Sequence, residues 1–398
     1  MPPVRPPDDD ELARELAELR RVTTDLEQAT AAGEPTTQLQ RRRTALEEAV
    51  RRRTRRVGGV AAEHDRPLAV RALTEALAGA VLLEIAELHG DLYGVAVADG
   101  RAHLVGLGRH SAVVDQVESA RSSLRRLAHQ RGSAASLSAA RLAADDAGRC
   151  LDELLLDPIR RWLGDRPLVV VPPASLHALP WGVVPSCRTR SVAVAPSAAI
   201  WLRASTAPRP ARRRVALVAG PDLPGGAAEV QSLAGLHPGA VVLRPEVATA
   251  EATSAALDGA SLAHVAAHGS FRSDNPLFSS LRMADGPLTI YDLERLRRAP
   301  HRIVLSACDS GLAGVRAGDE LMGLAAALFP LGTTGLVASV VPVPDGATQP
   351  LMCRLHRRLV AGDSLPTALT AARQADPDAD PGGAAFAAGA AFVSLGSL

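Results

Sequence analysis

Short apolar runs alternate with amphipathic segments along the second half of the chain, and this pattern predicts a mainly parallel β-sheet with helices between its strands. The expected strands lie near residues 214–219, 240–243, 261–267, 279–283, 301–307, 335–341 and 388–394. The expected helices lie near residues 226–235, 249–258, 290–298, 319–330, 347–361 and 364–374. Because strands this apolar are buried on both sides, the helices should cover both faces of the sheet.

The region from residue 67 to 203 has a mixed pattern that predicts a smaller α/β unit. Its expected elements are a helix at 67–86, strands at 92–97 and 102–107, helices near 111–130 and 136–157, and a buried strand at 167–172. The first two strands meet at Asp99-Gly100, a pair typical of tight β-hairpin turns.

Two amphipathic segments precede this unit. Leucine and valine recur at helical spacing over residues 11–29 and 38–57, and a Gly-Glu-Pro break at 33–35 separates the two segments. Each helix of the predicted hairpin has only a narrow apolar stripe, so the pair must pack on the following domain, on a second copy or on another protein. Docking on the chain's own domain is the expected arrangement.

These patterns divide the chain into five parts. They are a disordered tail at 1–10, a helical hairpin at 11–66, an N-terminal α/β half at 67–203, a linker at 204–213 and a second, catalytic α/β half at 214–398. The linker contains Pro208 and Pro210, which favour an irregular connection.

Composition narrows the choice of partners and compartment. The 398 residues are 47% hydrophobic and 22% charged, with a formal net charge of +1. Such a balance gives no long-range field for a polyanion, so we expect neither nucleic acid nor a membrane as a partner. The first residues lack the apolar segment of a signal peptide, and no apolar stretch is long enough to cross a bilayer, so we expect a cytoplasmic protein.

The candidate chemistry lies where two of the predicted strands end. His268 follows the apolar run at 262–267, and Cys308 follows the run at 303–307. In an open parallel sheet, the carboxyl ends of neighbouring strands converge on the crevice where ligands bind, so the two side chains can meet there. A thiol has an ordinary pKa of about 8.5, and an adjacent imidazole can take its proton. His268 and Cys308 are therefore a candidate base and nucleophile.

Two neighbours of this pair have expected roles. Gly269 lets a substrate approach the backbone closely, and its N–H group can point at a developing oxyanion. His264 lies four positions before His268 on the same face of the strand, and we expect a hydrogen-bonded core histidine that supports the site from within the sheet.

No metal and no cofactor are expected. The two histidines do not form a zinc pair, because the zinc-binding HExxH pattern has Glu after its first histidine, and Val265 holds that place. The glycine-rich run at 220–226 lacks both the GxGxxG register and the Lys-Ser/Thr of a phosphate loop. The remaining cysteines have no CxxC spacing and are expected to be structural; they are Cys150, Cys187 and Cys353.

Several separated blocks together resemble the CHAT family of caspase-like proteins, from about Leu83 to the C-terminus. They are LVVVP at 168–172, LHALPW at 176–181, PS at 196–197, HVAAHG at 264–269, LSAC at 305–308, GDELMGL at 318–324 and VASVVPVPD at 337–345. CHAT domains are similar to caspases, separases and gingipains. The resemblance implies a caspase-like sheet flanked by helices and preceded by a smaller pseudo-caspase-like unit. It also implies a cysteine endopeptidase with a His268/Cys308 dyad, an oxyanion hole from the N–H groups of Gly269 and Cys308, and no cofactor.

The sequence departs from the family pattern in two places. Family members usually carry Trp near position 341, whereas this chain has Val340-Val341, which changes the wall of the expected substrate pocket. Many relatives also carry long TPR arrays as sensors, whereas only a short helical hairpin precedes this domain. Activation would then come from a partner protein.

The expected substrate pocket contains Asp345, Ser306 and Asp309. A buried carboxylate at Asp345 would select Arg or Lys before the scissile bond. The alternative for Asp345 is a helix N-cap at the start of residues 345–348.

These expectations combine into one function: a cysteine endopeptidase that cleaves a protein substrate and is activated by a partner protein in a bacterial defence or signalling system. Two alternatives stay open. One is a catalytically inactive caspase-like module that binds or scaffolds a partner. The other is acyl transfer to, or hydrolysis of, a small thioester or amide by the same dyad.

Overall fold

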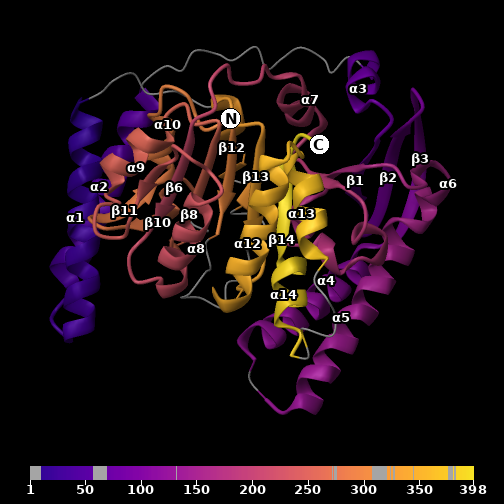
Figure 1. Cartoon of the computed structure of the whole chain (residues 1–398), viewed down its shortest axis with the longest axis horizontal. Coiled ribbons are helices and arrows are strands. Elements are labelled where there is room, and N and C mark those ends of the chain that lie inside the picture. Colours follow the sequence, from indigo (N-terminus) through magenta and orange to yellow (C-terminus); the bar gives the residue numbers. More distant parts are fainter. Residues whose placement is uncertain are drawn as a thin grey trace.

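A computed structural model shows how the predicted elements are arranged (Figure 1). It describes residues 10–56, 70–130, 132–270, 272, 276–306, 321–322, 324–325, 328–343, 345–374, 380 and 382–398. The helices are α1 Asp10–Ala32, α2 Thr37–Arg56, α3 Val70–Leu77, α4 His110–His129, α5 Ala134–Leu155, α6 Arg160–Leu163, α7 Ala198–Thr206, α8 Pro224–Ala234, α9 Ala250–Leu257, α10 Ile290–Glu294, α12 Asp345–Val360, α13 Leu365–Arg373 and α14 Ala384–Ala391. Short 3₁₀ turns include η5 Pro276–Phe278.

Within the described residues, eleven strands form one large mixed sheet. In spatial order they are β3 Arg101–Arg109, β2 Asp91–Ala98, β1 Val81–Leu88, β4 Leu168–Val171, β5 Val192–Val194, β14 Phe392–Gly396, β13 Gly335–Ser339, β12 Arg302–Leu305, β8 Leu262–Ala266, β6 Val215–Ala219 and β7 Val241–Leu243. A separate three-stranded sheet contains β9 Gly269–Ser270, β10 Ser280–Met283 and β11 Gly286–Thr289. The expected α/β class, with a large and mostly parallel sheet flanked by helices, is confirmed.

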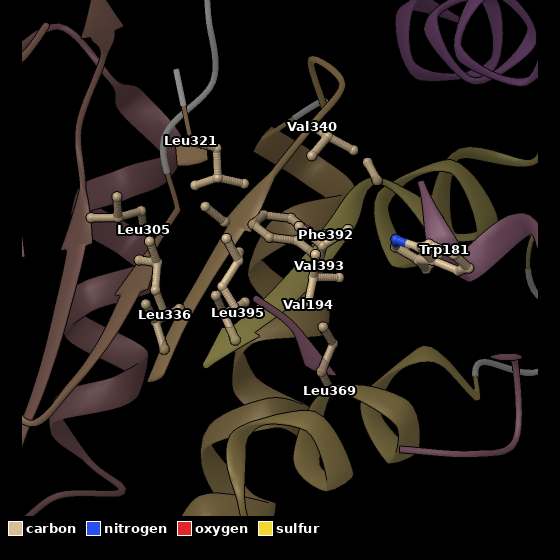
Figure 2. Packing of buried hydrophobic residues seen from close by; sticks show 14 of the residues in the cluster. Trp181, Val194, Leu305, Leu321, Leu336, Val340, Leu369, Phe392, Val393 and Leu395 are labelled. Carbon is tan, nitrogen blue, oxygen red and sulfur yellow. The ribbon is translucent and has the colours of Figure 1, made fainter. Parts of the chain in front are cut away.

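The last strand, β14, joins the two predicted halves. It pairs in parallel with β5 of the first half and antiparallel with β13 of the second half. Its buried side chains Phe392, Val393 and Leu395 lie near Val194 and Leu336 of the flanking strands, as Figure 2 shows. One sheet and one main apolar cluster therefore extend across both halves, and the domain boundaries drawn from the sequence stay a prediction.

Three sequence expectations need correction. The helix expected at 67–86 is α3 followed by strand β1, because Ala78 and Gly79 take positive φ angles of 48° and 92° and end the helix. The strand expected at 388–394 is the end of α14 followed by β14. Its alanine-rich run is buried throughout, and a continuous apolar run does not distinguish a buried helix from a buried strand. The strand expected at 279–283 is β10, which belongs to the small sheet rather than the large one.

The N-terminal helical hairpin packs on its own domain, as expected. Leucines of α1 and Val50 of α2 form an apolar cluster with Phe278 and Tyr291. The Arg20 side chain adds polar contacts, donating to the Pro287 carbonyl at 3.1 Å and to the Asp292 carboxylate at 3.0 Å. In Figure 1 the hairpin lies at one end of the molecule, beside the small sheet.

Candidate active site

The strands that lead to His268 and Cys308 are neighbours in the sheet. β8 and β12 run parallel, and their register pairs Val304 with His264 and Leu305 with Val265. The N–H group of Ser306 continues this ladder by donating to the Val265 carbonyl at 2.9 Å. Cys308 and Asp309 lie outside the described residues. The carboxyl ends of the two expected strands thus lie at the same edge of the sheet.

The imidazole of His268 is oriented by a backbone carbonyl. His268 is half-buried beyond the end of β8, and its Nε2 lies 2.8 Å from the carbonyl oxygen of Asp222. Because a carbonyl can only accept a hydrogen bond, Nε2 is the donor in this contact. In the neutral ring, Nδ1 is then the nitrogen that can take a proton.

The loop that supplies this carbonyl follows β6 and is held close to the end of β8. The Gly220 N–H donates to the Ala266 carbonyl at 2.7 Å. A Cβ atom at Gly220 would lie 2.7 Å from both the Ala267 Cβ and the Arg282 carbonyl oxygen, so only glycine fits without a shift of the backbone. Two residues later, Asp222 has a left-handed backbone with φ of 58°, which is uncommon for a residue other than glycine.

The backbone N–H of Gly269, the expected oxyanion-hole donor, is not used in the pairing of β9 with β10. Gly269 pairs with Leu281 of β10, and the next bond in the ladder runs from the Arg282 N–H to the His268 carbonyl at 2.8 Å. Gly269 and Leu281 are therefore a non-hydrogen-bonded pair, in which the N–H of Gly269 points away from β10. Since β9 is the edge strand of the small sheet, this N–H points outward from that sheet.

His264 is a buried core histidine, as expected, and it belongs to a hydrogen-bonded row. Its Nε2 lies 2.7 Å from the Glu229 carboxylate on α8, and its Nδ1 lies 3.1 Å from Nε2 of His356 on α12. Nδ1 of His356 in turn lies 2.8 Å from Nε2 of His237. All four side chains are buried. The contacts are consistent with each imidazole donating toward Glu229, from His237 to His356, from His356 to His264 and from His264 to the carboxylate.

Burial determines the protonation of this row. It lowers the pKa of His356 well below its usual value of 6.5, and the neighbouring His264 and His237 lower that pKa further. The pKa of His237 is also lowered, first by burial and then by the charge of Arg213. Both rings are therefore neutral at neutral pH, which agrees with the hydrogen-bond directions above.

The other expected pocket residues lie near the same edge of the sheet. Ser306 is 5% exposed, and its backbone is bonded to β8. Asp345 is the first residue of α12, which follows β13. Val340 and Val341, which stand where the family usually has Trp, are both buried. The role of each residue in substrate binding stays a prediction.

The described cysteines are free thiols in protected surroundings. Burial, with a smaller contribution from Asp152, raises the pKa of Cys187 to about 12. Burial likewise raises the pKa of the half-buried Cys353. Since the thiolate is the nucleophile, these two thiols are poorly suited to catalysis.

An apolar pocket lies on the opposite face of the same strands. Val265 and Leu305 contribute to its wall. Successive side chains of a strand point to opposite faces of the sheet. Val265 and Leu305 therefore lie on the face opposite to that of His264. The rest of the wall comes from α9, β10, β11, α10 and β12, together with Ser279, Pro300, Leu324 and Leu328.

No cluster of three or more His, Cys, Asp or Glu side chains could hold a metal ion in the described part of the chain. None of the described helices is both long enough and apolar enough to cross a membrane.

The fold and the ends of β8 and β12 define a caspase-like α/β protein. The family model described as the CHAT domain matches residues 145–392, more than half of the chain, so the chain belongs to the CHAT domain family. No curated protein matches the sequence.

Two solved structures are similar to this fold, both of the separase–securin complex of Saccharomyces cerevisiae. The first has a TM-score of 0.59 and 9% sequence identity, covering 82% of this chain and 30% of that chain. The second has a TM-score of 0.54 and 9% identity, covering 83% of this chain and 31% of that chain. At this identity the likeness shows the fold alone, and this chain spans less than a third of the length of those proteins.

The sequence does not reveal several residues around His268 and His264. Asp222 acts through its backbone carbonyl, a group that every residue has. Glu229, His237 and His356 come from separate helices and turns, and only the fold brings them to His264. The one available signal is Gly220, a glycine directly after a buried strand, which marks a close approach of two backbone segments.

Proposed function

We propose that this chain is a cysteine endopeptidase in which His268 and Cys308 form the catalytic dyad. The adjacency of β8 and β12 carries this proposal. Their register pairs Val265 with Leu305, and the same three-residue step leads from Val265 to His268 and from Leu305 to Cys308 along the sequence. Membership of the CHAT family and the caspase-like fold agree with it.

The reaction has two halves in this proposal. Nδ1 of His268 takes the thiol proton, and the Cys308 thiolate attacks the peptide carbonyl to form a C–S bond. The tetrahedral intermediate collapses, the C–N bond breaks and the imidazolium gives its proton to the leaving amine. Water then donates a proton to His268 and attacks the thioester, which releases the acid and restores the thiol.

The N–H groups of Gly269 and Cys308 would stabilise the oxyanion of each tetrahedral intermediate. The outward direction of the Gly269 N–H supports this role. One such donor is worth about 3 to 4 kcal/mol of transition-state stabilisation.

The substrate pocket is proposed to include Asp345, Ser306 and Asp309, with a protein as the substrate. A carboxylate at Asp345 would favour Arg or Lys before the cut. Peptide libraries test this directly, and turnover with no preference for basic residues would dismiss the pocket assignment. Activation by a partner protein in a bacterial defence or signalling system is part of the same proposal.

The decisive experiment compares Cys308→Ala with the matched variant Cys353→Ala. A thiol-reactive peptide probe should label wild-type protein at Cys308, and cleavage of an identified protein substrate should be lost in Cys308→Ala but kept in Cys353→Ala. Since removing the nucleophile of a catalytic unit costs several orders of magnitude in rate, the effect should be unambiguous. Equal turnover by Cys308→Ala would remove the assignment. A folded wild-type protein that no probe labels would favour the inactive binding module instead.

A further inference from the structure

We propose that Arg282 is a positioning residue for His268, and that it connects the N-terminal helical hairpin to the active site. The inference rests on the proposed role of His268 as the catalytic base. Arg282 belongs to β10 of the small sheet and lies close to His268 in both sequence and space. None of the sequence motifs includes it.

Three residues form a closed cycle of contacts. The His268 ring donates from Nε2 to the Asp222 carbonyl at 2.8 Å. The Asp222 carboxylate lies 3.3 Å from Nη2 of Arg282. The backbone N–H of Arg282 donates to the His268 carbonyl at 2.8 Å, which closes the cycle. The ring of His268 is thus held by a loop whose own position depends on Arg282.

The backbone of Asp222 explains why this loop needs an external contact. Its left-handed conformation, with φ of 58°, costs free energy for a residue other than glycine. The side chain of Asp222 is 67% exposed, and its carboxylate forms an ion pair with Arg282. Such a conformation persists only where the surroundings enforce it. The contact with Arg282 supplies part of that enforcement, and the tight approach at Gly220 supplies another part.

The same guanidinium group also reaches the hairpin. Nη1 of Arg282 lies 3.2 Å from the Glu27 carboxylate on α1. The hairpin contacts the small sheet and its surroundings at further points. Arg20 donates to the Pro287 carbonyl of β11 and to Asp292 of α10, and Glu47 of α2 accepts a hydrogen bond from Arg272, which follows β9. In Figure 1, α1 extends alongside β11 and β10. A displacement of the hairpin would therefore remove one of the two carboxylates that hold Arg282 in place.

The chain offers a closely matched control pair. Asp99 also has a left-handed backbone, with φ of 51°, and an exposed carboxylate that pairs with an arginine, Arg166, at 2.8 Å. Its side chain is 65% exposed, against 67% for Asp222. The control pair lies in the first half of the chain, with Asp99 at the turn between β2 and β3 and Arg166 just before β4. It carries the same local strain and the same kind of ion pair without a contact to His268.

The experiment measures two properties of the full-length protein in Arg282→Gln, Asp222→Asn and Glu27→Gln. The first is the fraction of the Nε2–H tautomer of His268, from nitrogen NMR of histidine-labelled protein. The second is the rate at which iodoacetamide alkylates Cys308, followed on the Cys308 peptide by mass spectrometry. We expect Arg282→Gln and Asp222→Asn to lower both, with a roughly two- to fivefold slower alkylation, the range that an exposed ion pair can supply. Glu27→Gln should act in the same direction.

Controls separate positioning from general stability. Arg282→Lys should restore most of the wild-type tautomer fraction, whereas Asp99→Asn and Arg166→Gln should change neither property. Asp222→Gly keeps the carbonyl and permits the left-handed backbone, so it should resemble Arg282→Gln if the carboxylate is what matters. Wild-type values for both Arg282→Gln and Asp222→Gly would overturn the positioning role. Wild-type values for Glu27→Gln alone would overturn the connection to the hairpin.

A separate variant, His268→Ala, tests the proposed dyad itself. If His268→Ala alkylates as fast as wild type, the dyad fails, whatever the Arg282 variants show. The tautomer measurement still decides the positioning role in that case, because it does not involve Cys308. A positioning role is overturned there too if the tautomer fraction in Arg282→Gln equals that of wild type.

Discussion

At the scale of single residues, the row of Glu229, His264, His356 and His237 is the most demanding part of the interior. His264 and His356 each have both ring nitrogens bonded within the row, and His237 stands at its end, bonded to His356. An added proton would place a charge in a buried site or reverse the donors and acceptors of the row. The row therefore links α8 and α12 to β8 only while His356 and His237 stay unprotonated.

Acidification should destabilise the fold through His356. Burial holds its folded pKa well below the unfolded value near 6.5, so the unfolded chain binds more protons below that pH. This part of the stability is complete above pH 6.5 and is lost as pH falls toward the folded pKa. Urea unfolding between pH 8 and pH 5 should show a decreasing free energy of unfolding.

A variant separates His356 from the other titrating groups. His356→Gln should be less stable than wild type at pH 8, by about 1–3 kcal/mol for the broken row, and should lose less stability on acidification. His237 and His301, whose pKa values are also lowered by burial, keep their share of the pH dependence in this variant. An identical pH dependence in His356→Gln and wild type would contradict this prediction.

At the scale of elements, the small sheet and the helical hairpin form one unit beside the end of β8. The first strand of the sheet begins directly after His268, and α1 packs against its last strand. Gly286, with φ of +121°, lies so close to α1 that a Cβ atom there would be 2.6 Å from Arg20. The hairpin is thus closely fitted to the sheet rather than loosely attached.

A single core substitution in α1 should loosen this unit. Leu16 is 2% exposed and belongs to the cluster with Phe278 and Tyr291, so Leu16→Ala should destabilise the docked hairpin by about 2–5 kcal/mol. Hydrogen exchange should become faster in α1, α2 and β11 before it changes in β4. The matched variant Leu142→Ala removes a leucine that is 68% exposed and should leave exchange unchanged. Unchanged protection of α1 in Leu16→Ala would show that the hairpin does not depend on this cluster.

Sequence patterns predict elements well where periodicity and burial agree. The apolar runs before His268 and Cys308 correspond to β8 and β12, and the narrow stripes of α1 and α2 correctly indicate a docked hairpin. They fail at the alanine-rich α14, where every face is apolar, and at residues 78–79, where two positive φ angles end a helix early. The support of His268 by a carbonyl and by Arg282 arises from tertiary contacts, which no local pattern encodes.

At the scale of the whole molecule, β14 is the strand on which the union of the two halves depends. It is the only described strand placed between β5 and β13, and Phe392 and Leu395 are fully buried among side chains of both halves (Figure 2). The order of this sheet is therefore not sequential, since a strand near the end of the sequence occupies its centre.

Weakening β14 should destabilise the first half of the chain as well as the second. Phe392→Ala should cost about 3–5 kcal/mol. The three tryptophans, Trp162, Trp181 and Trp201, all belong to the first half, so their fluorescence reports on that half in urea unfolding. Fluorescence and circular dichroism should show the same lowered midpoint. The control Val360→Ala changes a residue that is 42% exposed and should keep the wild-type midpoint. A tryptophan transition that ignores Phe392→Ala would mean that the halves unfold independently.

The central place of β14 also has a consequence for the order of events during translation. Residues 392–396 leave the ribosome after every other described strand. Strands β5 and β13 are therefore synthesised before β14, the strand that pairs with both of them. Until β14 pairs with β13, the edge of β13 that faces away from β12 is exposed. A nascent chain therefore cannot complete the sheet that carries β8 and β12 until residues 392–396 have been synthesised.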